Sequence, residues 1–129
     1  MKDVILALKK LIVIMKVTLT DVFLKEVQTA AMLEEIKDQL AEQRDLVALL
    51  KDEIEFCVSS SAPEWEKKYA VELQKTLDEI DSLEMKKWDL NFKLKELGAE
   101  RERLVEAIYN NKVFLKETRK KGKKKMMKK

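Results

Sequence analysis

Histidine is absent from this sequence, and cysteine and proline occur once each, as Cys57 and Pro63. Without histidine the chain has no Ser-His or Cys-His pair, and a single cysteine leaves no spacing typical of a transition-metal site. A disulfide within the chain is excluded, and a reducing compartment is expected. We therefore expect no enzymatic activity, no cofactor and no bound metal.

Turn-forming residues are also scarce, because the 129 residues include two glycines and one proline. A compact globular fold of this length needs several connections, which Gly, Pro, Asn or Asp usually mark. Only one such cluster occurs, at residues 59–63. Charged residues make up 40% of the chain and hydrophobic residues 46%. This balance indicates an all-α protein of long helices, each with one buried apolar stripe.

The first half of the chain carries one unbroken heptad frame, the pattern typical of a left-handed coiled coil. Polar residues interrupt it at Glu26, Thr29 and Gln43. Gln43 either fixes the register of the pairing or is simply tolerated. The a and d positions of this frame are Ile5, Leu8, Ile12, Met15, Leu19, Val22, Glu26, Thr29, Leu33, Ile36, Leu40, Gln43, Val47, Leu50, Ile54 and Cys57.

A second heptad frame follows residue 64 and is out of phase with the first. Its polar members Lys87, Arg101 and Asn111 are expected to fix register or to pair with acidic residues of the first helix. The a and d positions of this frame are Tyr69, Leu73, Thr76, Ile80, Leu83, Lys87, Leu90, Leu94, Leu97, Arg101, Leu104, Ile108, Asn111 and Leu115.

The interruption between the two frames predicts a stop and a restart. Ser61 and Glu64 have the spacing of a capping box, in which the Ser61 hydroxyl accepts from the Glu64 amide. Pro63 suits the first turn of a helix. We predict helices over 1–58 and 64–116, a turn or kink at 59–63 and a basic disordered tail at 117–129. The similar helix lengths favour an antiparallel hairpin within a larger coiled-coil assembly, while a homodimer of extended helices fits the same heptads.

Several large apolar residues lie off these frames and are candidates for contacts with partners. Residues 1–16 are hydrophobic on more than one side, which fits either burial among several helices or a position at a membrane interface. In the second array, exposed aromatic residues on a helix mark a protein contact or packing within a larger bundle. The partner-binding candidates are Trp65, Lys68, Tyr69, Trp88, Phe92, Tyr109 and Phe114.

Positive charge is concentrated at the C-terminus. Up to residue 116 the chain has 19 Lys and Arg against 23 Asp and Glu, but from residue 117 it has 8 against 1. Such a tail fits acidic tubulin surfaces, nucleic acid, anionic lipid or a nuclear-import receptor. Without interleaved aromatic residues, specific nucleic-acid recognition is not expected. The tail candidates are Arg119, Lys120, Lys121, Lys123, Lys124 and Lys125.

No signal peptide and no transmembrane segment are expected. Lysines interrupt the apolar N-terminal stretch, and its longest apolar run, residues 11–15, is far below the ~20 residues that span a bilayer. A cytoplasmic location is therefore expected.

The segment Trp65-Glu66-Lys67-Lys68-Tyr69, followed by Glu72 and a heptad helix, resembles the W-x-x-K-Y segment of the IQ-motif coiled-coil subunits of the nexin-dynein regulatory complex in motile cilia and flagella. The resemblance covers residues 65–108. It implies an axonemal linker or scaffold built from paired long helices. The family's calmodulin-binding IQ segment is absent, because the tail Arg119-Lys120-Lys121-Gly122 has no preceding Ile-Gln pair, so calmodulin binding is not implied.

The sequence thus predicts a non-enzymatic coiled-coil scaffold of a cytoskeletal, microtubule-associated assembly. Its expected partners are other coiled-coil proteins, in a homo- or hetero-oligomer, and tubulin through the basic tail; the axoneme of a cilium or flagellum is the expected site. The alternative is a general adaptor or trafficking protein whose polybasic tail binds a membrane or a nuclear partner.

Overall fold

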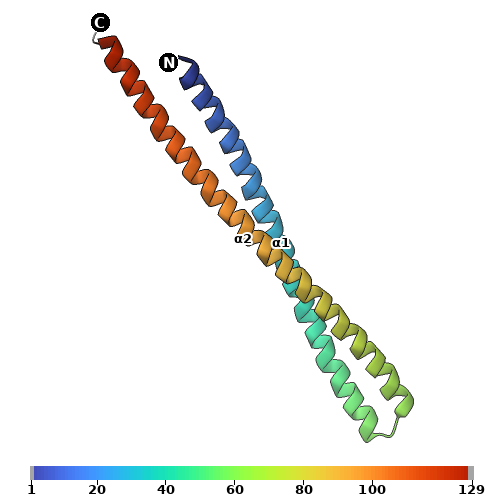
Figure 1. The fold of residues 1–129 in the computed structure, drawn as a ribbon. Helices are drawn as coiled ribbons and strands as arrows, with labels where there is room; N and C mark the ends of the chain where they lie inside the picture. Colours follow the sequence, from blue (N-terminus) through green and yellow to red (C-terminus); the bar gives the residue numbers. More distant parts are fainter. Residues whose placement is uncertain (1, 128–129) are drawn as a thin grey trace. The chain divides into compact units, whose positions relative to one another are not determined.

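The computed structural model describes residues 2–127, and the side chains of residues 2–122. Two helices, α1 (Lys2–Ser59) and α2 (Pro63–Met127), make up almost all of this part of the chain, which contains no strand. A short turn at residues 60–62 joins them, and the helices run antiparallel (Figure 1). The predicted all-α helical hairpin is confirmed.

The hairpin divides into two compact units, which we describe separately. The terminal unit comprises Met1–Gln28 and Leu94–Lys129, and the turn unit comprises Thr29–Lys93. In the turn unit, the Arg44 guanidinium lies 2.5 Å from a carboxylate oxygen of Glu84. In the terminal unit, the Arg101 Nε lies 2.9 Å from Glu26 Oε1. Each pair links α1 to α2 within its unit and defines the local register.

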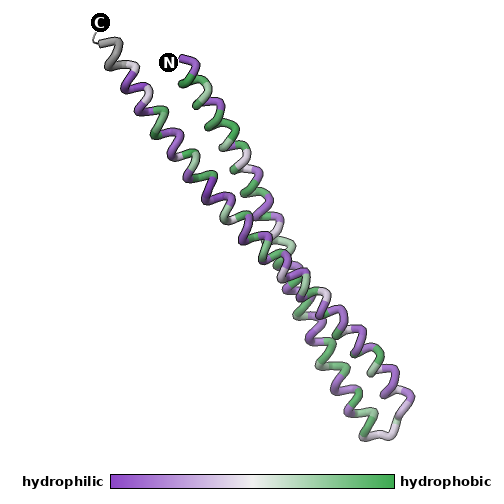
Figure 2. The backbone as a smooth tube through the Cα atoms, viewed as in Figure 1, coloured by the Kyte–Doolittle hydropathy of each residue, from purple (hydrophilic) through white to green (hydrophobic). Residues whose placement is uncertain are grey.

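The buried residues of α1 are those that the heptad frame predicts. Every a and d position from Ile5 to Cys57 is buried or half-buried, and every other residue described in α1 is exposed. Leu40 is the most deeply buried apolar residue, with 2% of its surface accessible. Because two helices cover only one stripe of each other, the remaining apolar residues of α1 stay in solvent. Figure 2 shows closely spaced hydrophobic residues along the N-terminal part of α1.

In α2 all predicted a and d positions are also buried or half-buried, but the helix does not end where we expected. The prediction of a disordered tail from residue 117 differs from the structure, in which α2 continues to Met127. Thr118 and Gly122 continue the second heptad frame, and Thr118 is buried with its hydroxyl donating to the Phe114 carbonyl at 2.8 Å. Lysine is also a good helix former. Lys128 and Lys129 lie outside the described residues.

The turn differs from the predicted capping box. Ser61 has a φ of 52°, in the left-handed region, whereas an N-cap residue is extended. The Ala62 amide donates to the Cys57 carbonyl at 2.9 Å, and the Ser61 amide donates to the Val58 carbonyl at 3.3 Å. These two bonds form a Schellman motif, so Ser61 terminates α1.

The N-cap of α2 lies one residue later than predicted, at Ala62 instead of Ser61, while the helix itself begins one residue earlier, at Pro63 instead of residue 64. The Glu66 amide donates to the Ala62 carbonyl at 3.0 Å, which makes Ala62 the N-cap residue. Pro63 is then the first helical residue, where its missing amide hydrogen costs nothing, and it lies in the first turn as the sequence predicted. Glu64 and Glu66 place negative charge in the first turn, next to the positive end of the helix dipole.

Replacing Ser61 by glycine is expected to stabilise the hairpin. A left-handed conformation costs an ordinary residue roughly 1–2 kcal/mol, and glycine loses part of that gain through its greater freedom in the unfolded chain. We expect S61G to raise the free energy of unfolding by about 0.5–1 kcal/mol in urea denaturation followed by circular dichroism. Ser60→Gly is the control, because Ser60 has no positive φ. A gain for S60G equal to that for S61G would contradict this account.

Candidate partner-binding surfaces

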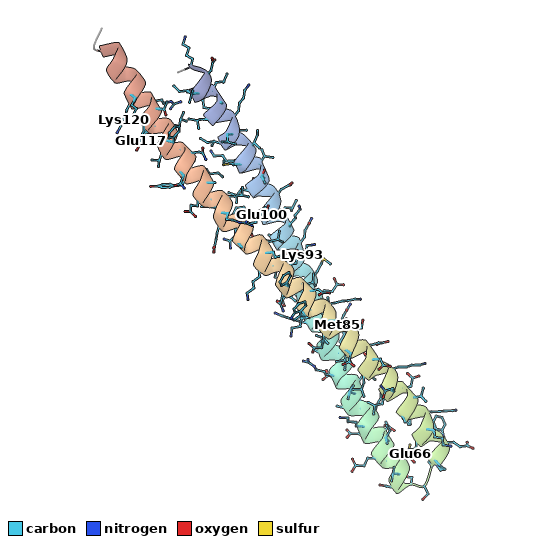
Figure 3. All side chains as sticks on the ribbon, viewed as in Figure 1. Glu66, Met85, Lys93, Glu100, Glu117 and Lys120 are labelled. Atoms are coloured by element: carbon cyan, nitrogen blue, oxygen red, sulfur yellow. The ribbon has the colours of Figure 1, made fainter. Side chains whose placement is uncertain are left out.

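An exposed apolar cluster on α2 is the best-defined candidate surface of the turn unit. Met85, Trp88 and Phe92 are spaced by three and four residues and share one face of the helix. Their exposed fractions are 71%, 67% and 52%. The Trp88 and Phe92 rings stack with centroids 5.8 Å apart and an interplanar angle of 12°. We call these three residues the outward patch; Figure 3 labels Met85.

The outward patch joins two sequence-predicted candidates, Trp88 and Phe92, and adds a residue that the sequence analysis missed. Met85 precedes Trp88 by three residues, so helical spacing could have found it. Because the a and d residues of α2 already face α1, the patch lies on the surface that the hairpin itself does not cover. Large exposed apolar side chains of this kind are typical of protein contacts, and Met and Trp are both enriched there.

The predicted Trp65, Lys68 and Tyr69 form a second cluster near the turn. The Lys68 Nζ lies 4.8 Å from the Trp65 ring centroid, in a cation-π contact. The Trp65 and Tyr69 rings are 6.2 Å apart and tilted by 31°. Trp65 is exposed, whereas Tyr69 is half-buried at its heptad position. The W-x-x-K-Y spacing thus builds one local cluster beside a shallow hollow lined by Trp65, Lys67, Lys68, Tyr69, Val71 and Glu72.

The other two aromatic candidates, Tyr109 and Phe114, both lie in the terminal unit and are exposed. Being five residues apart, they project to different sides of α2, so the structure does not bring them together. Tyr109 lines a shallow hollow with Val105 and Arg101. Each therefore belongs to a separate face of the terminal unit.

A further apolar stripe lies on α1 of the terminal unit, away from the buried frame. Its members repeat with heptad spacing at positions b and f, and more than half of each side chain is exposed. From the sequence we predicted only that residues 1–16 are hydrophobic on more than one side; the heptad spacing of the exposed residues up to Val27 could also have been found there. The members are Leu6, Val13, Val17, Leu24 and Val27.

Among the described side chains of the terminal unit, the buried frame contains one ion pair, and pairing with an acidic residue of the first helix is one of the two roles that the sequence predicted for Arg101. The Glu26 and Arg101 side chains, 21% and 39% exposed, meet with Oε1 and Nε 2.9 Å apart. Neither atom has an aligned hydrogen-bond partner, so the contact is an ion pair rather than a directed bond. The Arg101 guanidinium carbon also lies 6.0 Å from the Phe23 ring centroid. Arg101 thus links α2 to α1 in this unit.

Within residues 2–127 the structure brings together no group of His, Cys, Asp or Glu residues that would bind a metal. Cys57 is a free, buried thiol at its predicted heptad position. No helix in this described part has an apolar stretch long enough to cross a membrane.

Comparisons with protein-family models, with curated proteins and with solved structures found no match to this chain. The resemblance of the Trp65–Tyr69 segment to the ciliary IQ-motif subunits therefore stays a prediction from the sequence.

Proposed function

We propose that the protein is a structural coiled-coil scaffold or linker subunit, which binds a helix of another coiled-coil protein through the outward patch. The observation that carries this proposal is the exposed, stacked arrangement of Met85, Trp88 and Phe92 on a helix whose other face is already packed. Val71 lies two heptads before Met85 and is 57% exposed. A partner helix lying along this face of α2 would cover both.

A cytoskeletal assembly, and in particular the ciliary axoneme, is the setting that we propose. This part rests on the resemblance of the Trp65-x-x-Lys68-Tyr69 segment to the ciliary subunits, and on the long heptad helices that such linkers use. Immunolocalisation in ciliated cells is expected to show the protein on axonemes. Absence from axonemes and from other microtubule structures would remove this setting and leave the scaffold proposal standing.

Substitution of the outward patch tests the scaffold proposal. We expect M85S/W88S/F92S to lose incorporation into the detergent-insoluble cytoskeletal fraction, because a partner helix loses its apolar anchors. Its unfolding free energy should change little, since these side chains are exposed in the hairpin.

The matched control is L49S/F56S/V58S, which removes three exposed apolar side chains from α1 of the same unit. This variant should be incorporated like the wild type. Equal incorporation of both variants, or equal loss, would contradict the assignment of the contact to the outward patch.

A further inference from the structure

The heptad frames place like charges at corresponding positions of the two helices in the terminal unit. Glu26 and Arg101 meet at equivalent heptad positions, so a step of seven residues back along α1 and forward along α2 keeps the register. In an antiparallel pair the e positions of the two helices lie opposite each other, and the e position of Phe23 corresponds to that of Val105. One heptad further along, the position of Lys16 corresponds to that of Lys112, and after one more, the position of Lys9 corresponds to that of Arg119.

The same heptad relation gives an attractive pair in the turn unit, where Arg44 and Glu84 occupy equivalent positions and form an ion pair. In the terminal unit these positions hold four cations. None of the four forms an ion pair with another residue whose side chain the structure describes. Like charges at facing positions repel, so this part of the hairpin carries an unfavourable interaction that an anionic partner would relieve.

Heptad positions b and e of both helices form one side of the terminal unit, and this side is rich in positive charge. We call it the cationic side. Its lone carboxylate among residues 2–28 and 94–122 is Glu102. The opposite side, at positions c and g, is mixed: it carries Lys25, Arg103 and Lys121 with Asp21, Glu96, Glu100 and Glu117. The cations of the cationic side are Lys2, Lys9, Lys16, Lys95, Lys112, Lys116 and Arg119.

Exposed apolar side chains lie between these cations. Leu6 and Val13 are 53% and 60% exposed, and Tyr109 on α2 is 67% exposed. Beside Val13, the lysine stems of residues 9 and 10 line a shallow hollow together with Ile14. Figure 3 labels Lys120, which carries positive charge to the adjoining edge of α2. The cationic side therefore combines positive charge with aliphatic and aromatic surface.

We propose that the cationic side of the terminal unit binds the surface of an anionic lipid bilayer. Lysine and arginine contact the headgroups, while Leu6, Val13 and Tyr109 enter the interfacial layer. A flexible acidic peptide would neutralise the charge but leave these apolar residues in water, whereas a bilayer surface covers both. This inference goes beyond the proposed scaffold function and uses residues outside the outward patch.

Charge reversal on α1 tests the inference in the full chain. We expect the wild type to co-sediment with vesicles of phosphatidylcholine and phosphatidylserine, and not with phosphatidylcholine alone. K9E/K16E should bind at least about tenfold more weakly, since each basic residue near such a surface contributes about 1 kcal/mol. Its melting temperature should rise by about 2–5 °C, because each new glutamate faces Lys112 or Arg119.

The matched control is K51E/K67E, which makes the same charge change in the turn unit and should bind within about threefold of the wild type, because both lysines lie outside the terminal unit that carries the cationic side. Equal loss in the two variants, or no loss in K9E/K16E, would overturn the inference. A rise in melting temperature together with unchanged lipid binding would also overturn it.

A second variant separates lipid from other polyanions. V13S/Y109S should lose binding to the phosphatidylserine vesicles but keep binding to polyglutamate, which contacts only the cations. Wild-type binding to polyglutamate or RNA without binding to the vesicles would refute the lipid assignment. Failure of these tests is distinct from failure of the scaffold proposal, which is measured with the outward-patch variants.

Discussion

Replacing Leu40 by alanine is expected to lower the free energy of unfolding by about 2–5 kcal/mol. Leu40 is 2% exposed and lies at an a position of the turn unit. The substitution removes buried apolar area and leaves a cavity that the facing helix fills only in part. Because alanine is the better helix former, the loss reports on packing and not on helix propensity. Urea denaturation followed by circular dichroism measures it.

Leu49→Ala is the matched control, since Leu49 lies on the same helix in the same unit but is 62% exposed. We expect a change within about 0.5 kcal/mol. If both variants lost the same stability, α1 would be burying its other face, and the heptad seam would not be the core of the hairpin.

The Glu26–Arg101 pair is expected to make an asymmetric contribution to stability. R101L should lower the free energy of unfolding by about 1–2 kcal/mol, because Glu26 is left without a partner while its side chain is only 21% exposed. E26L should cost less, since the 39% exposed Arg101 can extend into water. The double variant E26L/R101L should be at least as stable as the wild type, because leucines at facing a positions pack against each other.

A thermodynamic cycle from these three variants measures the coupling between the two residues. The comparison pair is Arg44 and Glu84, whose side chains are 60% and 42% exposed, and whose coupling should be below about 1 kcal/mol. A double variant E26L/R101L less stable than the wild type would show that the ion pair stabilises the hairpin more than the two leucines do.

The sequence alone predicted the buried stripe of each helix. Leu40, Val47 and Cys57 could be assigned to the buried stripe because a seven-residue repeat is a local pattern, in which each member lies about two helical turns after the previous one on the same face. The break after residue 58 could also be predicted from neighbouring residues, because Pro63 cannot continue a helix. Trp88 and Phe92 were found because an aromatic residue off the seam stays exposed when only two helices pack.

The form of the turn could not be predicted in this way. Ser61 and Glu64 have the spacing of a capping box, but Ser61 instead takes the left-handed conformation that ends α1. That position usually holds glycine, so a serine there does not mark it. The tail was likewise misjudged, because its charge suggested disorder while Thr118 extends the buried seam and α2 continues to Met127.

Which residues form the heptad seams, and where the two helices separate, follows from the sequence by itself, because both depend on neighbours within a few turns. Which residues face each other was decided only by the tertiary structure. The pairing of Glu26 with Arg101 and that of Arg44 with Glu84 depend on the direction and register of two helices whose residues are far apart in the chain. A heptad pattern is compatible with several registers, and packing of one helix against the other selects among them.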